Sequence, residues 1–266
     1  MKIAVLLKQV PDSQSVRLDA ETGTLLRDPA DAVTNPLDLC ALGAAARLTE
    51  EVPRATVTAL TMGPTAAQRT LRQALALGAA RGILICDPAC AGSDTYVTAR
   101  ILAAALEKFG PFDLILTGLR ASDGETGQVG PEIAARLGLP VVTGAEALTR
   151  VDEGLFEVLR SSEMSHETIR FRLPALVSTA KGIGQANLPT LERKTWARRE
   201  PLTILSATEL GLAPDAVGLN ASPTQVVKVL HPKVVRRGKI LAVSDTASLD
   251  RATEAFLSVV RGGSAK

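Results

Sequence analysis

The chain has 266 residues, 46% of them hydrophobic and only 3% aromatic, so it can bury one sizeable and mainly aliphatic core. Its net charge of +2 excludes the strongly basic character of a general nucleic-acid binder. The sequence has no stretch of about 20 apolar residues and no signal-peptide pattern at its start, so we expect a soluble, cytoplasmic protein without a membrane span.

Strand and helix patterns alternate through the first half of the chain. Continuous apolar runs bounded by proline or glycine are typical of buried strands, and apolar residues spaced by three and four indicate helices. Asn35 as a cap and Pro36 at the first helical position mark one helix start. The predicted order is a strand at 2–10, a polar connection at 11–34, a helix at 35–51, a strand at 55–63, a helix at 64–78, a strand at 82–87, a helix at 93–110, a strand at 113–118, a helix at 131–138 and a strand at 139–144.

The second half of the chain has a different texture. Residues 147–160 and 167–180 look like a β-hairpin that returns to the sheet. The irregular, proline-containing residues 206–266 are interpreted as a C-terminal arm, with an extended tail as the alternative. The alternation indicates an α/β fold, a parallel sheet with helices on both faces, and residues 1–205 are expected to form its nucleotide-binding domain.

Ligands of open parallel sheets bind beyond the carboxyl ends of the strands, where the strand order reverses. Four junctions have suitable chemistry there: KQVP, NPLD, DPACAGSDT and GLRASDGETGQVGP. They are far apart in sequence, yet this fold would bring them to one edge of the sheet. We therefore expect a binding site built from several loops.

Two of these junctions can bind anions. In AGSDTYVTA, a helix begins after Ser93 and Asp94, and Thr95 or Thr98 can donate a hydroxyl to a phosphate. In DGETGQVGP, three glycines allow successive N–H groups to form a nest, and Gln128 can donate and accept. The plainer interpretations are a helix cap and an ordinary βα loop. A helix terminus contributes only about 0.3–1 kcal/mol to a bound charge, so several loops must converge on a nucleotide.

Other functional motifs are absent from the sequence. There is no P-loop, no GxGxxG after the first strand and no GxSxG elbow, and no catalytic pair can be defended. The two histidines, His166 and His231, are far apart, and the three cysteines, Cys40, Cys86 and Cys90, lack zinc-site spacing. We expect no metal site, and the free thiols fit a reducing compartment.

Taken together, the junctions resemble the β subunit of electron transfer flavoproteins over residues 1 to about 205. The order and spacing of the stretches match, so no single motif carries the resemblance. The matching stretches are KIAVLLKQVPD, TGTLLRDPADAVTNPLDLCALGAAARL, VTALTMGP, LRQALALGAARGILI, residues 91–99 without Tyr96, DLILTGLRASDGETGQVGP and LPALVSTAKG.

The resemblance implies an adenine nucleotide α-hydrolase-like fold and a heterodimer with an α subunit that carries a redox FAD. The β subunit binds a second nucleotide, which is AMP in ordinary members. In electron-bifurcating members it is a second FAD, which takes electrons from NADH and divides them between a low-potential carrier and the other flavin. The chain would then be an electron carrier subunit, not a complete enzyme, with an acyl-CoA dehydrogenase or related protein as redox partner.

The family's nucleotide contacts carry over by position. They comprise Leu6, Asn35, Pro36, Leu37, Asp38, Met62, Gly118, Leu119, Arg120, Ala121, Ser122, Asp123, Gly124, Glu125, Thr126, Gly127, Gln128 and Val129, to which the phosphate-site argument adds Ser93, Asp94, Thr95 and Thr98. Gly127 and Val129 stand where AMP-binding members commonly have Asn and Thr. The sequence TGQVGP resembles the TAQVGP of bifurcating members, so FAD is favoured over AMP as the nucleotide of this site.

The family's partner-recognition loop maps onto KGIGQANLPTLERK, with its leucine anchor at Leu188. The alternative is a buried loop leucine. The basic residues at 193–199 are interpreted as a solvated face, and Trp196 can contact the α subunit or pack internally. The rival function is a stand-alone nucleotide-binding module like the universal stress proteins. A PP-loop ligase is weaker still, because its SGGxDS loop is missing.

Overall fold

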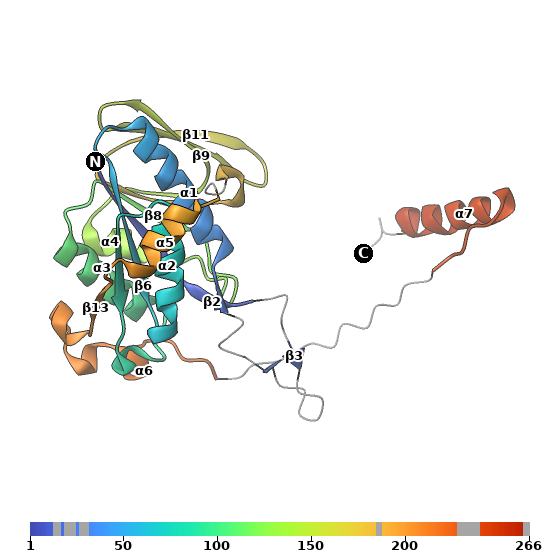
Figure 1. Cartoon of the computed structure of the whole chain (residues 1–266). Coiled ribbons are helices and arrows are strands. Elements are labelled where there is room, and N and C mark those ends of the chain that lie inside the picture. The colour runs from blue at the N-terminus through green and yellow to red at the C-terminus, as the bar shows by residue number, and fades with distance from the viewer. Residues whose placement is uncertain (13–16, 19–24, 27–31, 185–187, 228–239, 263–266) are drawn as a thin grey trace. The chain divides into compact units, whose positions relative to one another are not determined.

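The computed structural model describes residues 1–12, 17–18, 25–26, 32–184, 188–227 and 240–262 (Figure 1). The chain divides into two compact units, Met1–Gln225 and Val226–Lys266, and each is described by itself. The sequence places the start of the arm at residue 206, whereas the first unit continues for 20 residues beyond 205, to Gln225. Most of the expected polar connection at 11–34 lies outside the described residues.

A nine-stranded sheet forms the centre of the first unit, in the order β11-β10-β9-β12-β8-β1-β6-β7-β13. The pairs from β9 through β12, β8, β1, β6 and β7 to β13 are parallel, and β9, β10 and β11 pair antiparallel at one edge. The strands are β1 (Lys2–Leu7), β6 (Thr56–Met62), β7 (Arg81–Ile85), β8 (Leu114–Gly118), β9 (Val141–Asp152), β10 (Leu155–Ser161), β11 (His166–Arg172), β12 (Ala175–Thr179) and β13 (Thr203–Leu205).

Helices cover both faces of the sheet, as expected for an α/β fold (Figure 1). Side chains of β1 alternate between the two faces: Ile3, Val5 and Leu7 join one core cluster, and Ala4 and Leu6 join the other. The first cluster contains residues of α1 (Pro36–Glu51), α2 (Gln68–Ala76) and α5 (Leu191–Arg199), and the second contains residues of α3 (Thr95–Phe109) and α4 (Val129–Leu137).

Two small antiparallel sheets and several short helices complete the described chain. The small sheets pair β2 (Gln9–Pro11) with β5 (Ala32–Thr34) and β3 (Arg17–Leu18) with β4 (Leu25–Leu26). The short helices are η2 (Thr65–Ala67), η3 (Pro88–Cys90), η4 (Lys181–Ile183), η5 (Thr208–Leu210), η6 (Pro214–Ala216) and α6 (Gly218–Ala221).

Several local features differ in detail from the sequence predictions, including the strand predicted at 139–144, which is β9 at Val141–Asp152. The first strand ends at Leu7, because the next amide, of Lys8, donates to a side chain instead of continuing the parallel ladder. The helix at 64–78 begins as the 3₁₀ turn η2 before α2. Asn35 lies at the N-cap position of α1 but makes no side-chain bond to its backbone, because the side chain bonds to the carboxyl of Asp38 and to the backbone of Arg120 and Ser122. By contrast, Asp94 caps α3 through the amide of Val97.

Residues 206–225 follow β13 and belong to the first unit. Ala207 N donates to Asp87 Oδ2 at 3.0 Å, and Gly218 N donates to Ser93 Oγ at 3.1 Å. The second unit contains α7 (Thr246–Gly262), whose apolar side chains are largely exposed, with Phe256 68% and Val259 72% accessible. Among the described residues, no helix is long and apolar enough to cross a bilayer.

Candidate functional site

The strand order reverses between β1 and β8. From β1 the chain proceeds to β6 and β7 on one side, and β8 then pairs with β1 on the other side. Their carboxyl ends, Leu7 and Gly118, therefore border the crevice in which an open parallel sheet binds its ligand. The N-termini of α1, α3 and α4 all follow strand ends at this edge.

Asn35 ties the start of α1 to the loop that follows β8. Its Nδ2 donates to Asp38 Oδ1 at 2.9 Å and to Arg120 O at 3.0 Å, and its Oδ1 accepts from Ser122 N at 3.2 Å. The residue is 1% exposed, so these bonds satisfy a buried amide. A residue that the sequence predicts as a cap is thus a tertiary link.

Asp38 joins the ends of the two strands at the reversal. Its Oδ2 accepts from Lys8 N at 2.7 Å, and its Oδ1 accepts from Gly118 N at 3.1 Å. Burial raises the pKa of this carboxyl to about 7, although hydrogen bonds from Asn35, Lys8 and Gly118 act in the opposite direction. A Cβ on Gly118 would collide with Oδ1 of Asp38, so only glycine fits there.

The loop at 119–128 follows β8 and is tied to the residue after β1, while several of its amide groups stay unbonded among the described residues. Lys8 Nζ and Asp123 Oδ1 form an ion pair at 2.8 Å, which links the end of β1 to this loop. Gly127 has a φ of +65°, a conformation that favours glycine. Within the described residues, no hydrogen bond uses the amide N–H of Thr126, Gly127 or Gln128, which remain available to an anionic ligand.

The N-termini of α3 and α4 meet across a second group of polar side chains. Thr95 Oγ1 lies 3.2 Å from Gln128 Oε1 and 3.1 Å from Glu132 Oε1. Oγ1 of Thr117 and Oε2 of Glu132 are buried without a hydrogen-bond partner in the described part of the chain. Thr95 and Gln128, predicted from separate motifs, are therefore brought together.

Ser93 and Asp94 lie at the same helix end, but their side chains have internal partners. Asp94 Oδ2 accepts from Thr224 N at 3.0 Å and from Thr224 Oγ1 at 2.8 Å. Ser93 Oγ donates to Cys90 O at 2.8 Å. Their backbone amides are used as well, since Ser93 N donates to Cys90 O at 3.3 Å and Asp94 N donates to Ser222 Oγ at 2.9 Å. Their expected role at a phosphate stays a prediction.

The remaining predicted residues lie around the same edge. Leu6 is 6% exposed near the end of β1, and Met62 ends β6 and packs on the α3–α4 side of the sheet. Leu37 O accepts from Thr179 Oγ1 at 3.3 Å, and Leu119 N donates to Thr179 O at 2.9 Å. Pro36, Arg120, Ser122, Asp123, Gly124, Glu125, Thr126 and Gln128 are exposed, and Ala121, Val129 and Thr98 are half-buried.

Sequence reasoning missed Lys8 and Glu132 as members of this group. Lys8 belongs to the KQVP junction, so its position directly after the first strand was an available signal. Glu132 follows Pro131 in the first helical turn, where an acidic residue is ordinarily explained by the helix dipole. Only the contact with Thr95 distinguishes it from a surface glutamate.

The residues present fit a phosphate-containing nucleotide. Free amide groups at 126–128 and the Thr95 hydroxyl at the start of α3 can serve as donors, and Gly118 and Gly127 leave room where a Cβ would crowd Asp38 or the carbonyl of Leu119. Glu132 adds an acceptor that a ligand hydroxyl can use. No group of three or more metal-ligating side chains is found among the described residues, and His231 lies outside them.

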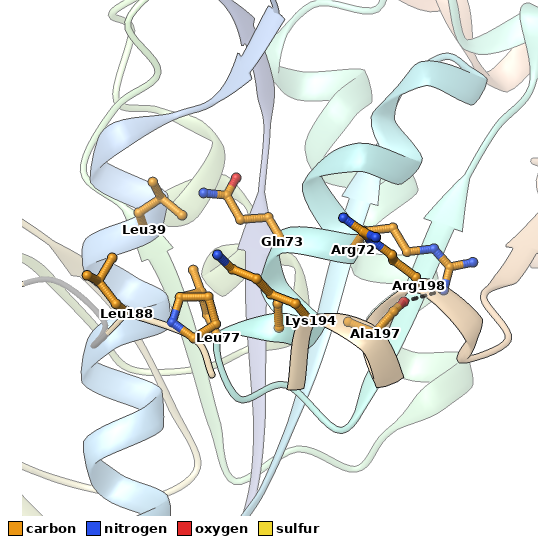
Figure 2. A pocket seen from close by; sticks show the side chains of 10 residues that line it. Leu39, Arg72, Gln73, Leu77, Leu188, Lys194, Ala197 and Arg198 are labelled. Carbon is orange, nitrogen blue, oxygen red and sulfur yellow. Dashed lines mark hydrogen bonds between the residues drawn. The ribbon is translucent and has the colours of Figure 1, made fainter. Parts of the chain in front are cut away.

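Leu188 lies on a different face of the unit. It is 95% exposed, so the alternative of a buried loop leucine is wrong. It lines two adjoining hollows of about 470 and 350 Å³ between α1, α2 and α5. Figure 2 shows Leu188 beside Leu39 and Leu77, with Lys194 across the hollow.

The basic segment 193–199 is only partly a solvated face. Arg193 is half-buried, donates to Leu75 O at 3.0 Å and to Ala79 O at 2.7 Å, and stacks on the Trp196 ring at 4.1 Å. Lys194, Arg198 and Arg199 are exposed, in agreement with the sequence interpretation. Arg193 is therefore a structural clamp, and Trp196 packs against the core of this side.

Comparison with known proteins identifies the family. Residues 22–210 match the electron transfer flavoprotein domain. The chain is 39% identical to the caffeyl-CoA reductase–Etf complex subunit CarD of Acetobacterium woodii, over 91% of this chain and 92% of that protein. It is 40% identical to the electron transfer flavoprotein subunit beta of Thermoanaerobacterium thermosaccharolyticum, over 90% and 92%. It is 37% identical to protein FixA of Azorhizobium caulinodans, over 94% and 92%. The chain therefore belongs to the electron transfer flavoprotein family, among its β subunits.

Proposed function

We propose that the chain is the β subunit of an αβ electron transfer flavoprotein and that the crevice between β1 and β8 binds FAD in preference to AMP. The observation that carries the proposal is the meeting of Thr95 and Gln128, 3.2 Å apart. It brings the Thr95 hydroxyl of α3 next to the loop whose amide groups are free, so both elements can contribute donors to one binding surface. Donors from two elements suit the two phosphates of a dinucleotide better than a single phosphate.

In this proposal the side chains bind and orient the nucleotide. Asn35 and the Lys8–Asp123 pair hold the loop in place, and Asp38 fixes both strand ends. Gly118 and Gly127 let the backbone approach closely. When bound, FAD supplies the redox chemistry, and the protein contributes position and electrostatics.

We further propose electron bifurcation with NADH as the donor. The support is the TGQVGP wording of the loop and the similarity to CarD, whose name makes it a subunit of a caffeyl-CoA reductase–Etf complex. By the same reasoning the redox partner is a dehydrogenase or reductase that acts on an acyl-CoA thioester. Leu188 is its proposed anchor, since a 95% exposed leucine beside a hollow can enter a partner's pocket.

We propose that the far end of the arm at 206–266, which contains α7, packs on the α subunit. The support is the exposed apolar side of α7, which includes Leu249, Phe256 and Val260. An amphipathic helix with such a side is typical of a segment that a partner covers.

The test is co-expression with the gene of the α subunit, purification, and quantification of released nucleotides after denaturation. We expect a yellow heterodimer that releases two FAD molecules. One FAD with one AMP would reject the preference for FAD and with it the support for bifurcation. A colourless homodimer that holds ATP would contradict the function altogether.

A further inference from the structure

Glu132 spans the gap between the N-termini of α3 and α4. Its Oε1 lies 3.1 Å from Oγ1 of Thr95, and the same hydroxyl lies 3.2 Å from Oε1 of Gln128. An ionised carboxylate only accepts hydrogen bonds, so the Thr95 hydroxyl is the donor in its pair with Glu132. That hydroxyl has one proton, and Glu132 competes for it with any other acceptor that enters the gap.

The second oxygen of Glu132 has no partner in the described chain. Oε2 is buried, receives no hydrogen bond, and takes part in none of the ion pairs found among the described residues. Arg136, one turn further along α4, lies over the Tyr96 ring at 4.2 Å. A buried carboxylate oxygen without a donor is unfavourable. We therefore expect a ligand to supply the donor.

Thr117 also has a polar atom, unpartnered in the described chain, next to the first turn of α4. It is 6% exposed, and its Oγ1 has no hydrogen-bond partner among the described residues. This oxygen lies 3.1 Å from the position of a Cβ on Gly130, so it faces the first turn of α4. Unpartnered buried polar atoms are uncommon in native proteins, and here two of them border one helix end.

The chemistry of the gap selects between parts of a nucleotide. A carboxylate oxygen accepts readily from the hydroxyl of a ribose or a ribityl chain. A terminal phosphate carries a charge of about −1.5 to −2 near pH 7, and the carboxylate of Glu132 would repel a phosphate bound next to it. A phosphate that is esterified on both sides carries less charge, so it is disfavoured less.

We propose that Glu132 is a specificity-determining residue of the crevice, which accepts a hydrogen bond from a sugar or ribityl hydroxyl through Oε2 and disfavours a terminal phosphate. The proposal rests on the nucleotide-binding function proposed above. It adds a physical reason why this chain would hold a dinucleotide in preference to AMP.

The experiment compares ADP with ADP-ribose. The second phosphate is terminal in ADP and is esterified to a ribose in ADP-ribose. Dissociation constants for both, and for AMP and FAD, are measured by calorimetry on the heterodimer after its exchangeable nucleotide is removed. In Glu132→Gln the charge is lost and a donor replaces Oε2. We expect ADP to gain about tenfold in affinity relative to ADP-ribose, a ratio that corresponds to about 1.4 kcal/mol.

One further variant separates the effect of charge from that of hydrogen bonding, and a second serves as a control. Glu132→Ala removes the acceptor as well, so ADP-ribose should bind more weakly while the relative gain of ADP persists. Glu107→Gln removes one exposed carboxylate from α3 and should change neither affinity. Thermal unfolding without nucleotide checks that each variant folds, and Glu132→Gln decides alone if the alanine variant does not fold.

The proposal is overturned if Glu132→Gln leaves the ratio of the ADP and ADP-ribose affinities within about twofold of wild type, a difference of only about 0.4 kcal/mol. In that case nucleotide binding by the wild type still stands. A wild-type heterodimer that binds none of the four nucleotides would instead refute the proposed function, and Glu132 would lose its role with it.

Discussion

The crevice and the α2–α5 face differ in whether the backbone groups at their helix ends are hydrogen-bonded. At the crevice, the start of α4 keeps free amide groups, and buried side chains such as Asn35 and Asp38 hold the surrounding backbone. On the α2–α5 face, arginines occupy the carbonyl groups at the helix ends. Arg193 donates to Leu75 O in the last turn of α2 and to Ala79 O just beyond it. Arg72 donates to Ala197 O in the last turn of α5 and to Glu200 O just beyond it.

This contrast separates a surface that is ready for an anion from one that is already satisfied. Free N–H groups at a helix start attract phosphate. On the α2–α5 face the carbonyl groups are already hydrogen-bonded, so the features left for a partner are the exposed Leu188 and the neighbouring basic side chains. The first surface should respond to changes in backbone geometry, and the second to loss of an arginine or of one exposed leucine.

The largest effect is expected from Gly118→Ala. The new Cβ would collide with Asp38 Oδ1 and lie 2.9 Å from Asp38 N, which is too close for any rotamer to relieve. We expect a loss of about 3 kcal/mol in the free energy of unfolding, measured by urea denaturation, together with loss of the nucleotide. The control is Gly124→Ala in the same loop, where a Cβ meets nothing within 4 Å. Equal stability of the two variants would contradict the close approach of β8 and α1.

The next effect concerns the pH dependence of stability through Asp38. Its pKa is raised from 3.8 to about 7 in the folded chain, so the folded state binds the proton more tightly than the unfolded state. The resulting stabilisation is complete below about pH 4 and is lost as the pH rises toward about 7. Chemical denaturation between pH 4 and pH 8 should show this decline, and Asp38→Asn should flatten it. Wild-type and variant profiles of the same slope would exclude Asp38 as the cause.

A smaller loss is expected from Arg193→Ala. The change removes the hydrogen bonds to Leu75 O and Ala79 O and the stacking on Trp196, which together should cost about 2 kcal/mol in the free energy of unfolding. Lys194→Ala is the matched control, because Lys194 is the adjacent basic residue and is exposed. Its stability should stay within about 0.5 kcal/mol of wild type. If both variants behave alike, the clamp has no energetic role.

The smallest effect on stability is expected from Leu188→Ala, because this side chain is 95% exposed. Stability should change by less than about 0.5 kcal/mol. If Leu188 is the partner anchor, acceptor affinity measured by electron-transfer kinetics should fall roughly 30-fold, as expected for an interface residue worth about 2 kcal/mol. Leu191→Ala, also exposed at 81%, should leave the kinetics unchanged. Unchanged kinetics in both variants would remove the anchor from this loop.

The sequence predicted the main sheet and its helices because their signals are local. Apolar runs and capping residues gave β1, β6, β7 and β8 within a few residues, and they brought the junctions to one edge through the rule for parallel sheets. Asn35 occupies the predicted N-cap position of α1, but its side chain makes no capping bond, and its partners Arg120 and Ser122 are too distant in sequence to be predicted. Similarly, nothing local distinguishes Glu132 from a helix-dipole residue, and only tertiary structure shows its unpartnered oxygen.

The exposure of Leu188 and the burial of Arg193 were undecidable for the same reason. A leucine in a loop and an arginine in a basic run have no pattern that states which neighbours they meet. The C-terminal boundary also depends on tertiary contacts, since Ser222 and Thr224 bind Asp94 across more than a hundred residues. Composition suggested an arm from residue 206, but those contacts keep 206–225 with the first unit.

The fit between Gly118 and α1 has a consequence for how this protein family can change over time. A Cβ at Gly118 would lie 2.9 Å from the backbone carbon of Leu37 and 2.9 Å from the amide nitrogen of Asp38. No substitution at position 38 can therefore compensate for a larger residue at position 118, because backbone atoms obstruct it as well. The end of β8 and the start of α1 should be inherited as one unit, and a relative with a side chain at the first position should also have a displaced or rebuilt helix start.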